Sequence, residues 1–262
     1  MKPAPDEDKA IFDNLKYYNI SDDPLFVAKK NLNYLNKNYP DKVLSVHNDY
    51  IAKVFQSRAM GFNGIEFNVE TSNLNIGHPP EYILDISAES YLEKISELNF
   101  SKLWFDLKSH ENEDLSELLN HLNNLDTIYS LKEKSLIESW ENGLKELVDN
   151  GWKTSFYINF ENDKDLQNCI PKEKCINKIF NRIIDSKTQS ISFFAKDYNF
   201  VKTYLEPILP AKISYHVFGF GYEHQVFNPK MIENVKVNDI FNDPRVDLIL
   251  LDGDQTYKYS KF

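Results

Sequence analysis

The amino-acid sequence predicts an α/β fold in which parallel strands close into a barrel of the TIM type, each strand being followed by a helix. Short apolar runs alternate with stretches of helical periodicity along most of the chain. The length of 262 residues suits such a barrel, and 42% hydrophobic residues supply a large core. The first apolar run leads into Val46-His-Asn-Asp-Tyr50, which lacks the glycine-rich turn typical of open doubly wound sheets.

The elements follow one another within a single domain, residues 1–262, since no repeat or Pro/Gly-rich linker divides the chain. We expect residues 1–22 to form a loose tail and residues 24–39 an additional N-terminal helix that covers one end of the barrel. An eighth strand is expected but not located. The seven predicted strands are Val43–His47, Gly64–Val69, Lys102–Lys108, Lys153–Phe160, Ser190–Ala195, Lys212–Phe218 and Val246–Leu251. The predicted helices are Tyr50–Met60, Ala88–Leu98, Leu115–Leu125, Ser135–Asn150, Ile176–Ser186, Tyr198–Leu209 and a segment near Met231–Phe241.

Charge and hydropathy exclude several classes of protein. The formal charge of −10 argues against a non-specific nucleic-acid binder, which needs a surplus of basic residues. No run approaches the ~20 apolar residues of a membrane-spanning helix, and the first residues do not form an export signal. A cytoplasmic location is therefore the default expectation, with an extracytoplasmic one open if a signal or anchor has been removed. Cys169 and Cys175 match no zinc pattern and are compatible with a local disulfide or with two free thiols.

Polar residues interrupt the predicted strands late, near their carboxyl ends. Parallel strands covered on both faces should be almost entirely apolar, so these interruptions are informative. In a barrel, the carboxyl ends of the strands form the active-site face, where these side chains are expected to converge. They are His47, Glu66, Asn68, His78, Asp106 and Lys108.

These residue types suit chemistry at a phosphorus atom. Glu66, Asn68 and Asp106 offer an all-oxygen set of ligands for Mg²⁺ or Ca²⁺. Two imidazoles, on His47 and His78, can serve as general acid and base. The set also includes Lys108, whose positive charge would stabilise the negative charge of phosphoryl oxygens. Each residue alone has an ordinary structural explanation, such as a capped strand end or a surface ion pair, and it is their coincidence at strand ends that favours a site.

The ordered set resembles the glycerophosphodiester phosphodiesterases and the sphingomyelinase D-type phospholipases. These families carry a His at the end of strand one, Glu-x-Asp on strand two, a second His shortly after, and an acidic-x-Lys pair on strand three. The Gly77-His-Pro-Pro80 loop and the Lys102-Leu-Trp-Phe-Asp-Leu-Lys108 strand are also similar to the menorin family. The motifs span Val43 to Ser109, about a quarter of the chain, and beyond them the likeness is one of topology.

The resemblance implies a phosphodiesterase-type barrel, with His47 and His78 as an acid/base pair. It also implies a divalent cation held by Glu66, Asp106 and residue 68, with Lys108 against the phosphate. The reaction would be hydrolysis or a cyclising transfer, on a small phosphodiester, a phosphoglycan or a lipid headgroup. Two departures, Asn68 for Asp and His47-Asn-Asp for His-Arg-Gly, leave open a barrel that binds a phosphorylated or sugar-phosphate ligand without turnover. A glycosidase using the carboxylates is a third hypothesis, in which His78 and Lys108 have no role.

Later strands add candidate substrate-binding residues. Each lies at or near the predicted end of a strand, or within one, where it would line the pocket. Each is also explained as a core or loop residue. They are Asn159, Lys196, His216 and Asp252. The sequence does not indicate an oligomeric state.

Overall fold

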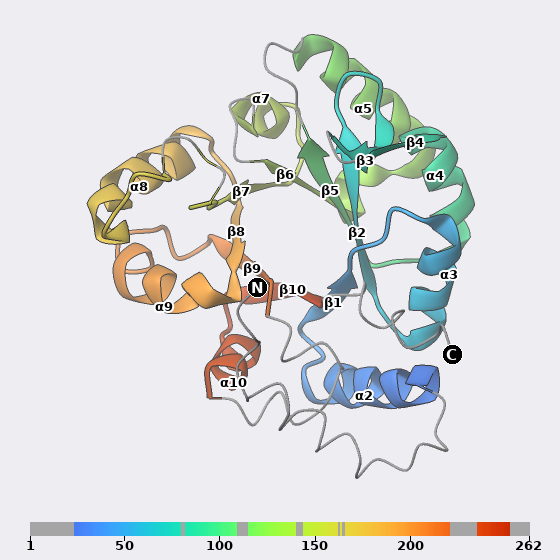
Figure 1. The fold of residues 1–262 in the computed structure, drawn as a ribbon. Coiled ribbons are helices and arrows are strands. Elements are labelled where there is room, and N and C mark those ends of the chain that lie inside the picture. The colour runs from blue at the N-terminus through green and yellow to red at the C-terminus, as the bar shows by residue number, and fades with distance from the viewer. Residues whose placement is uncertain are drawn as a thin grey trace, which may run out of the picture.

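The computed structural model shows strands arranged around a central axis with helices outside them (Figure 1). It describes residues 24–79, 82–108, 115–139, 144–161, 163, 166–220 and 235–251. The expected tail, residues 1–22, lies outside this part of the chain, as does Asp252.

The described strands form one sheet that curls into a barrel. Eight of them run parallel, in the order β1-β10-β9-β8-β7-β6-β5-β2. An antiparallel hairpin, β3 and β4, extends the sheet beyond β2. The strand bounds are β1 Val43–Val46, β2 Gly64–Glu70, β3 Asn75–His78, β4 Tyr82–Ser87, β5 Lys102–Lys108, β6 Ser135–Ser139, β7 Thr154–Tyr157, β8 Ser190–Phe194, β9 Ser214–Phe218 and β10 Val246–Leu251.

The barrel closes where β1 meets β2. A parallel bridge joins His47 to Glu66, and the backbone N–H of Asn48 donates to the carbonyl of Glu66 at 2.9 Å. Gly64 permits this approach, because a Cβ at its position would lie 2.8 Å from Cγ1 of Val43. The seam therefore brings the end of the first strand against the middle of the second.

Helices surround the barrel (Figure 1). The helix α4 shows how the sequence specifies one: Ser87 accepts a hydrogen bond from the N–H of Ser90 at its start, and an apolar stripe faces the strands. The α-helices are α2 Pro24–Asn38, α3 Ile51–Met60, α4 Ala88–Ile95, α5 Leu115–Tyr129, α6 Leu131–Lys134, α7 Leu144–Asp149, α8 Ile176–Asp185, α9 Tyr198–Phe200, which continues as a π-helical stretch over Val201–Leu205, and α10 Val235–Asn242. Short 3₁₀ turns lie at Ser96–Leu98, Lys172–Cys175 and Ala195–Asp197.

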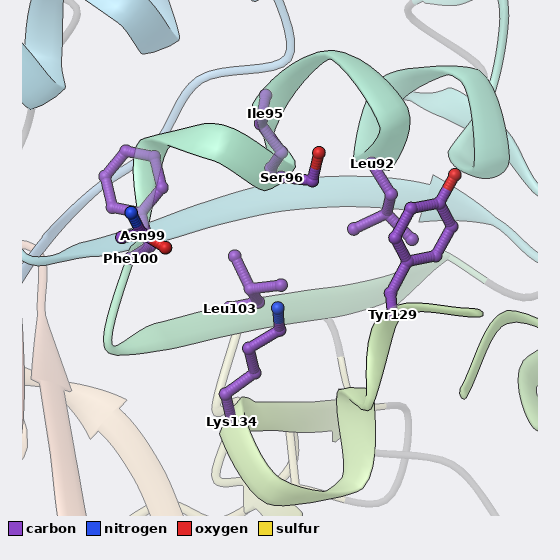
Figure 2. A pocket seen from close by; sticks show the side chains of 8 residues that line it. All are labelled: Leu92, Ile95, Ser96, Asn99, Phe100, Leu103, Tyr129 and Lys134. Atoms are coloured by element: carbon purple, nitrogen blue, oxygen red, sulfur yellow. The ribbon is translucent and has the colours of Figure 1, made fainter. Parts of the chain in front are cut away.

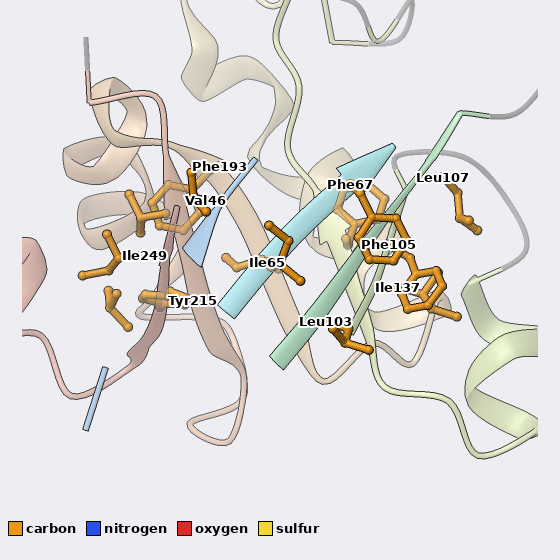
Figure 3. Packing of buried hydrophobic residues seen from close by; sticks show 14 of the residues in the cluster. Val46, Ile65, Phe67, Leu103, Phe105, Leu107, Ile137, Phe193, Tyr215 and Ile249 are labelled. Atoms are coloured by element: carbon orange, nitrogen blue, oxygen red, sulfur yellow. The ribbon is translucent and has the colours of Figure 1, made fainter. Parts of the chain in front are cut away.

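Alternate residues along each strand build two cores. The outward side chains join the large core between strands and helices, in which Ile65, Phe67 and Phe105 pack together (Figure 3). The inward ones form a smaller cluster around Trp104, Leu136 and Leu248. This smaller cluster fills the barrel interior below the carboxyl ends of the strands.

All seven predicted strands are present within a few residues of their expected bounds. The prediction of one helix over Ser135–Asn150 was wrong, because its first five residues form β6, the missing eighth strand, and α7 begins only at Leu144. Ser135–Ser139 are buried on both faces, as expected for a strand inside a parallel sheet. Because the strand is only five residues long and lies between helices, its periodicity does not distinguish it from a helical segment. The prediction of a loop over Gly77-His-Pro-Pro80 was also wrong in part, since Gly77 and His78 belong to β3.

The additional helix expected at residues 24–39 corresponds to α2. It lies beside the end of α3, where the amide of Asn36 donates to the carbonyl of Gly61 at 3.0 Å. Leu32 and Leu35 are fully buried. In the part of the chain that the structure describes, no helix combines the length and the hydropathy needed to cross a bilayer.

Cys169 and Cys175 form a disulfide across a short turn before α8, with their Cα atoms 5.8 Å apart. The sequence left this bond and a pair of free thiols as alternatives. The structure has the bond, which closes the loop that leads into α8.

Candidate active site

Charged side chains replace apolar ones on the inward face of the barrel near the carboxyl ends of the strands. Glu66 lies on β2, and Asp106 on β5 is in register with Asn68. Glu138 on β6 is in turn in register with Asp106. Adjacent parallel strands therefore carry acidic groups to the same end of the barrel, above the cluster around Trp104.

His47 follows β1 and lies between two carboxylates. Its Nε2 is 3.2 Å from Oδ2 of Asp49, and its Nδ1 is 3.6 Å from Oε2 of Glu66. The imidazole side chain is 35% exposed, whereas the two carboxylates are 1% and 5% exposed. The ring therefore reaches solvent while the acids that hold it are buried.

Asp49 is fixed by donors from two other strands. It accepts from the backbone N–H of Asn68 at 2.8 Å and from the side-chain amide of Asn68 at 2.9 Å. The hydroxyl of Tyr82 on β4 also donates to it. Burial alone would raise the pKa of Asp49, but His47, Asn68 and Tyr82 hold that pKa below its usual value. Asp49 is therefore ionised and placed to orient His47.

A second group lies beside the first. Lys108 donates to Asp106, and both side chains are largely buried, at 11% and 14% exposed. Burial would lower the pKa of Lys108, but Asp106 and its acidic neighbours raise it. Burial, together with the charge of Asp106, raises the pKa of Glu66 to about 7, although His47 opposes the shift. The carboxylates of the site therefore outnumber the positively charged side chains that could neutralise them.

Two of these residues were missed by sequence reasoning. Asp49 stands two residues after His47, where the resemblance drew attention to a missing Arg-Gly rather than to the acid present. Glu138 was assigned to a helix, although a single acid in the apolar run Ser135–Ser139 is a signal of an inward-facing polar group. Burial, and then the charge of Asp106, raise the pKa of Glu138 well above its usual value.

His78 lies on the β3–β4 hairpin rather than in a loop, and it is half-buried. Its backbone pairs with Tyr82, the residue whose hydroxyl reaches Asp49. Gly77 lets the two strands approach, since a Cβ there would lie 2.7 Å from Cα of Ile83. Tyr82 thus joins the hairpin to the group formed by His47, Asp49 and Asn68, and a role of His78 beside His47 stays a prediction.

The tentative substrate-binding residues fall in different places. Asn159 is buried after β7 and accepts from the N–H of Glu161 at 3.0 Å. Lys196 follows β8 and pairs with Glu161 at the surface. His216 faces the interior, with Nε2 3.1 Å from Asp247 near the amino end of β10. These contacts place Asn159 and Lys196 beyond the carboxyl ends of their strands and direct His216 toward the opposite end; their roles toward substrate stay predictions.

The donor chemistry of the mouth suits an oxygen-preferring cation. Oδ1 of Asp106 and Oε2 of Glu138 are buried without a hydrogen-bond partner among the described residues. Carboxylate oxygens of this kind are ligands that Mg²⁺ and Ca²⁺ take. Within the same described residues, no three His, Cys, Asp or Glu side chains lie close enough together to hold an ion as they stand.

A separate pocket lies outside the barrel, between α4, β5 and the end of α5 (Figure 2). Its volume is about 280 Å³, including open solvent at its mouth. Leu92, Ile95, Phe100 and Leu103 form its apolar wall, and Lys134 lies at one side. It contains none of the acid, imidazole or lysine groups described above, so it is not the candidate site.

The barrel is the fold of the glycerophosphodiester phosphodiesterases. It is similar to the crystal structure of such an enzyme from Parabacteroides distasonis, with a TM-score of 0.57, 15% identity, and coverage of 84% of this chain and 96% of that one. It is also similar to the enzyme from Thermotoga maritima, with a TM-score of 0.52, 12% identity, and coverage of 84% and 97%.

A third similar structure is an Oleispira antarctica phosphodiesterase in complex with its product sn-glycerol-3-phosphate. The TM-score is 0.52 and the identity 11%, over 83% of this chain and 95% of that one. No protein-family model matches the sequence, and neither does any curated protein. The likeness is therefore one of backbone fold, spanning nearly the whole of each related barrel.

Proposed function

We propose that this protein cleaves a small phosphodiester with the assistance of a divalent cation. The observation that carries the proposal is His47, partly exposed at the mouth and held between the buried carboxylates of Asp49 and Glu66. Beside it, the Asp106–Lys108 pair on β5 supplies an acid and a positive charge. The phosphodiesterase-type fold supports the same reaction class.

In the proposed reaction, the oxygen of water or of a neighbouring substrate hydroxyl attacks phosphorus and gives its proton to one imidazole. The bond between phosphorus and the leaving oxygen breaks, and the other imidazole protonates that oxygen. His47 and His78 form this pair, with Asp49 orienting His47. Attack by water gives a phosphomonoester and an alcohol, whereas attack by a substrate hydroxyl gives a cyclic phosphate.

Glu66, Asp106 and the amide oxygen of Asn68 would hold the cation, Mg²⁺ or Ca²⁺. When bound, it supplies positive charge to the phosphoryl oxygens as they gain negative charge. Lys108 adds a fixed charge on the same side, because its ammonium is kept protonated by Asp106. Asn159 and Lys196 would contact the alcohol part of the substrate from the neighbouring strand ends.

The test is a panel of glycerophosphodiesters, lysophospholipids and sugar phosphodiesters, assayed with Mg²⁺, Ca²⁺ or Mn²⁺ and with chelator. His47→Asn and His78→Asn should each lower the rate about 100-fold or more if they transfer protons. His121→Asn, on α5 in the outer helix layer, is the matched control and should leave the rate unchanged.

Near-normal turnover in both variants at positions 47 and 78 would refute the acid/base assignment. Absence of hydrolysis across the panel would refute the activity itself. A phosphorylated ligand that raises the melting temperature without being cleaved would then identify a binding barrel. Detection of a cyclic phosphate product by phosphorus NMR would assign the cyclising route.

A further inference from the structure

The carboxyl ends of β7, β8 and β9 carry aromatic rings into the barrel. These strands are neighbours (Figure 1), and their last residues are Tyr157, Phe194 and Phe218. The residue before each of the three belongs to the outer core between strands and helices. Because side chains alternate along a strand, the three rings point inward, at the end of the barrel where His47 and Asp106 lie.

The three rings contact one another and form a continuous surface, which we call the aromatic wall. Ring centroids are 4.7 Å apart between Phe194 and Phe218, 5.3 Å between Tyr157 and Phe218, and 6.1 Å between Tyr157 and Phe194. The ring of Trp104, in the interior cluster below, lies 6.1 Å from that of Phe218. Tyr157 is buried, whereas Phe194 and Phe218 are partly exposed. The aromatic wall is therefore packed from beneath and reaches solvent at the mouth.

The mouth is thus divided between two kinds of side chain. The ends of β1, β2, β5 and β6 bring together the histidine, acids and lysine described above, and the ends of β7, β8 and β9 carry the aromatic wall. The two halves adjoin at Tyr157, since burial and then the charges of Glu138 and Asp106 raise the pKa of its phenol. A substrate whose phosphate occupies the charged half would therefore place an ester group against the rings.

The surroundings of Phe194 indicate which kind of group fits. The ammonium of Lys196 lies 4.6 Å from the centre of the Phe194 ring and pairs with Glu161. Because the ring already holds a cation, a second cationic group would be repelled there. The backbone also approaches this ring closely at Gly219, whose φ is +63° and where a Cβ would collide with the ring. The ring is therefore fixed in place, and the aromatic wall suits a neutral apolar group.

We propose that the aromatic wall binds an apolar group, aryl or short alkyl, that is esterified to the phosphate of the substrate. The protein then prefers phosphodiesters with such a group to those in which both alcohols are glycerol. This inference deepens the proposed function and rests on it, because the charged half of the mouth supplies the site for the phosphate. Phe194 and Phe218 determine the specificity, and the buried ring of Tyr157 supports them.

The experiment compares two phosphodiesters that share one glycerol arm, glycerophosphoglycerol and benzyl glycerophosphate, assayed with Mg²⁺, Ca²⁺ and Mn²⁺ in turn. Both are esters of primary alcohols, so a difference between them reports contacts of the benzyl ring. The wild type should show a kcat/KM at least about tenfold higher for the benzyl ester. Phe194→Ala and Phe218→Ala should each abolish most of this preference. A loss of folded protein would instead lower both rates and leave their ratio unchanged.

Phe55→Ala is the matched control, because Phe55 is an exposed ring on α3, in the outer helix layer. It should leave both rates unchanged. Calorimetric titration with the same two esters keeps the inference testable if neither is cleaved. The benzyl ester should then bind at least about tenfold more tightly than glycerophosphoglycerol, and Phe194→Ala should remove most of the difference.

Equal kcat/KM values for the two esters in the wild type would overturn the inference and leave the proposed function in place. A preference that survives in both alanine variants would do the same. Selective binding of the benzyl ester, lost in Phe194→Ala, without cleavage of either ester would overturn the proposed activity alone. A wild type that neither cleaves nor binds the two esters would overturn both.

Discussion

Asn68 and Asp49 form a complementary pair at the mouth of the barrel. Both the backbone N–H and the side-chain amide of Asn68 donate to the carboxylate of Asp49, at 2.8 and 2.9 Å, and both residues are buried. An aspartate at position 68 would place lone pairs against that carboxylate. The departure from the Glu-x-Asp pattern at Asn68 is therefore accompanied by an acid two residues after His47. In this protein Asp49 carries the negative charge, and Asn68 carries the amide that donates to it.

This pairing predicts that the two residues can be exchanged but not altered singly. Asn68→Asp should lower the free energy of unfolding by about 3 kcal/mol, because two buried carboxylates would face each other. Asp49→Asn should cost about 1–3 kcal/mol through loss of the charged acceptor. The double variant again pairs one amide with one acid. Its loss in free energy of unfolding should therefore be smaller, by at least about 1 kcal/mol, than the sum of the losses in the two single variants. Urea unfolding in chelator measures all three, and strict additivity would show that the pair is not coupled.

Tyr82 connects the hairpin to the same pair. Its hydroxyl donates to Asp49, and burial, followed by that contact, raises the pKa of the phenol. Tyr82→Phe should therefore lower the free energy of unfolding by about 1–2 kcal/mol. It should also lower turnover, since Asp49 loses a donor that fixes it against His47. Tyr50→Phe, at a half-exposed ring close by, is the control and should change neither quantity; equal effects of the two changes would count against the contact.

Most strands could be predicted because their outward residues, such as Phe67 and Phe105, are apolar and pack on helices. The convergence of His47, Glu66 and Asp106 at one end followed from the direction shared by parallel strands. Asp49 could not be placed this way, because its partners Asn68 and Tyr82 come from distant segments and are fixed only by tertiary packing. Glu138 was not predicted as a site residue because β6 itself was not predicted. Five residues between helices show too little periodicity to distinguish a strand from a helix.

Closure of the barrel depends on the small residue at Gly64. A Cβ there would lie 2.8 Å from Cγ1 of Val43 and 3.1 Å from Cβ of Ser45. Gly64→Ala should lower the free energy of unfolding by about 1–3 kcal/mol through overpacking of the β1–β2 seam. Adding Val43→Ala removes the closest atom, so the double variant should lose less than the two single variants together. A loss equal to their sum, measured by urea unfolding, would mean that strain at Val43 is not the cause.

The interactions of Asp243, on the opposite side of the structure from the mouth of the barrel, should make the free energy of unfolding depend on pH. Its carboxylate accepts from Tyr198 at 2.9 Å and from the N–H of Arg245 at 2.9 Å, and pairs with Lys202 at 3.0 Å. Burial would raise the pKa of Asp243, but these partners hold it below its usual 3.8. The stabilisation is then fully present above pH 3.8 and is lost as the pH falls through the lower pKa of the folded state.

Asp243→Asn should therefore lower the free energy of unfolding by about 2 kcal/mol at pH 7, with the difference from wild type shrinking below pH 3.8. Urea unfolding of both proteins from pH 7 to pH 2 measures it. Asp149→Asn, which breaks a half-exposed pair with Lys187, should change stability by no more than about 0.5 kcal/mol at any of these pH values. A difference in the free energy of unfolding between wild type and Asp243→Asn that stayed constant down to about pH 2 would contradict this. Protonation of Asp243 in the wild type would then make no difference, and the stabilisation would come from the packing of the side chain and not from its charge.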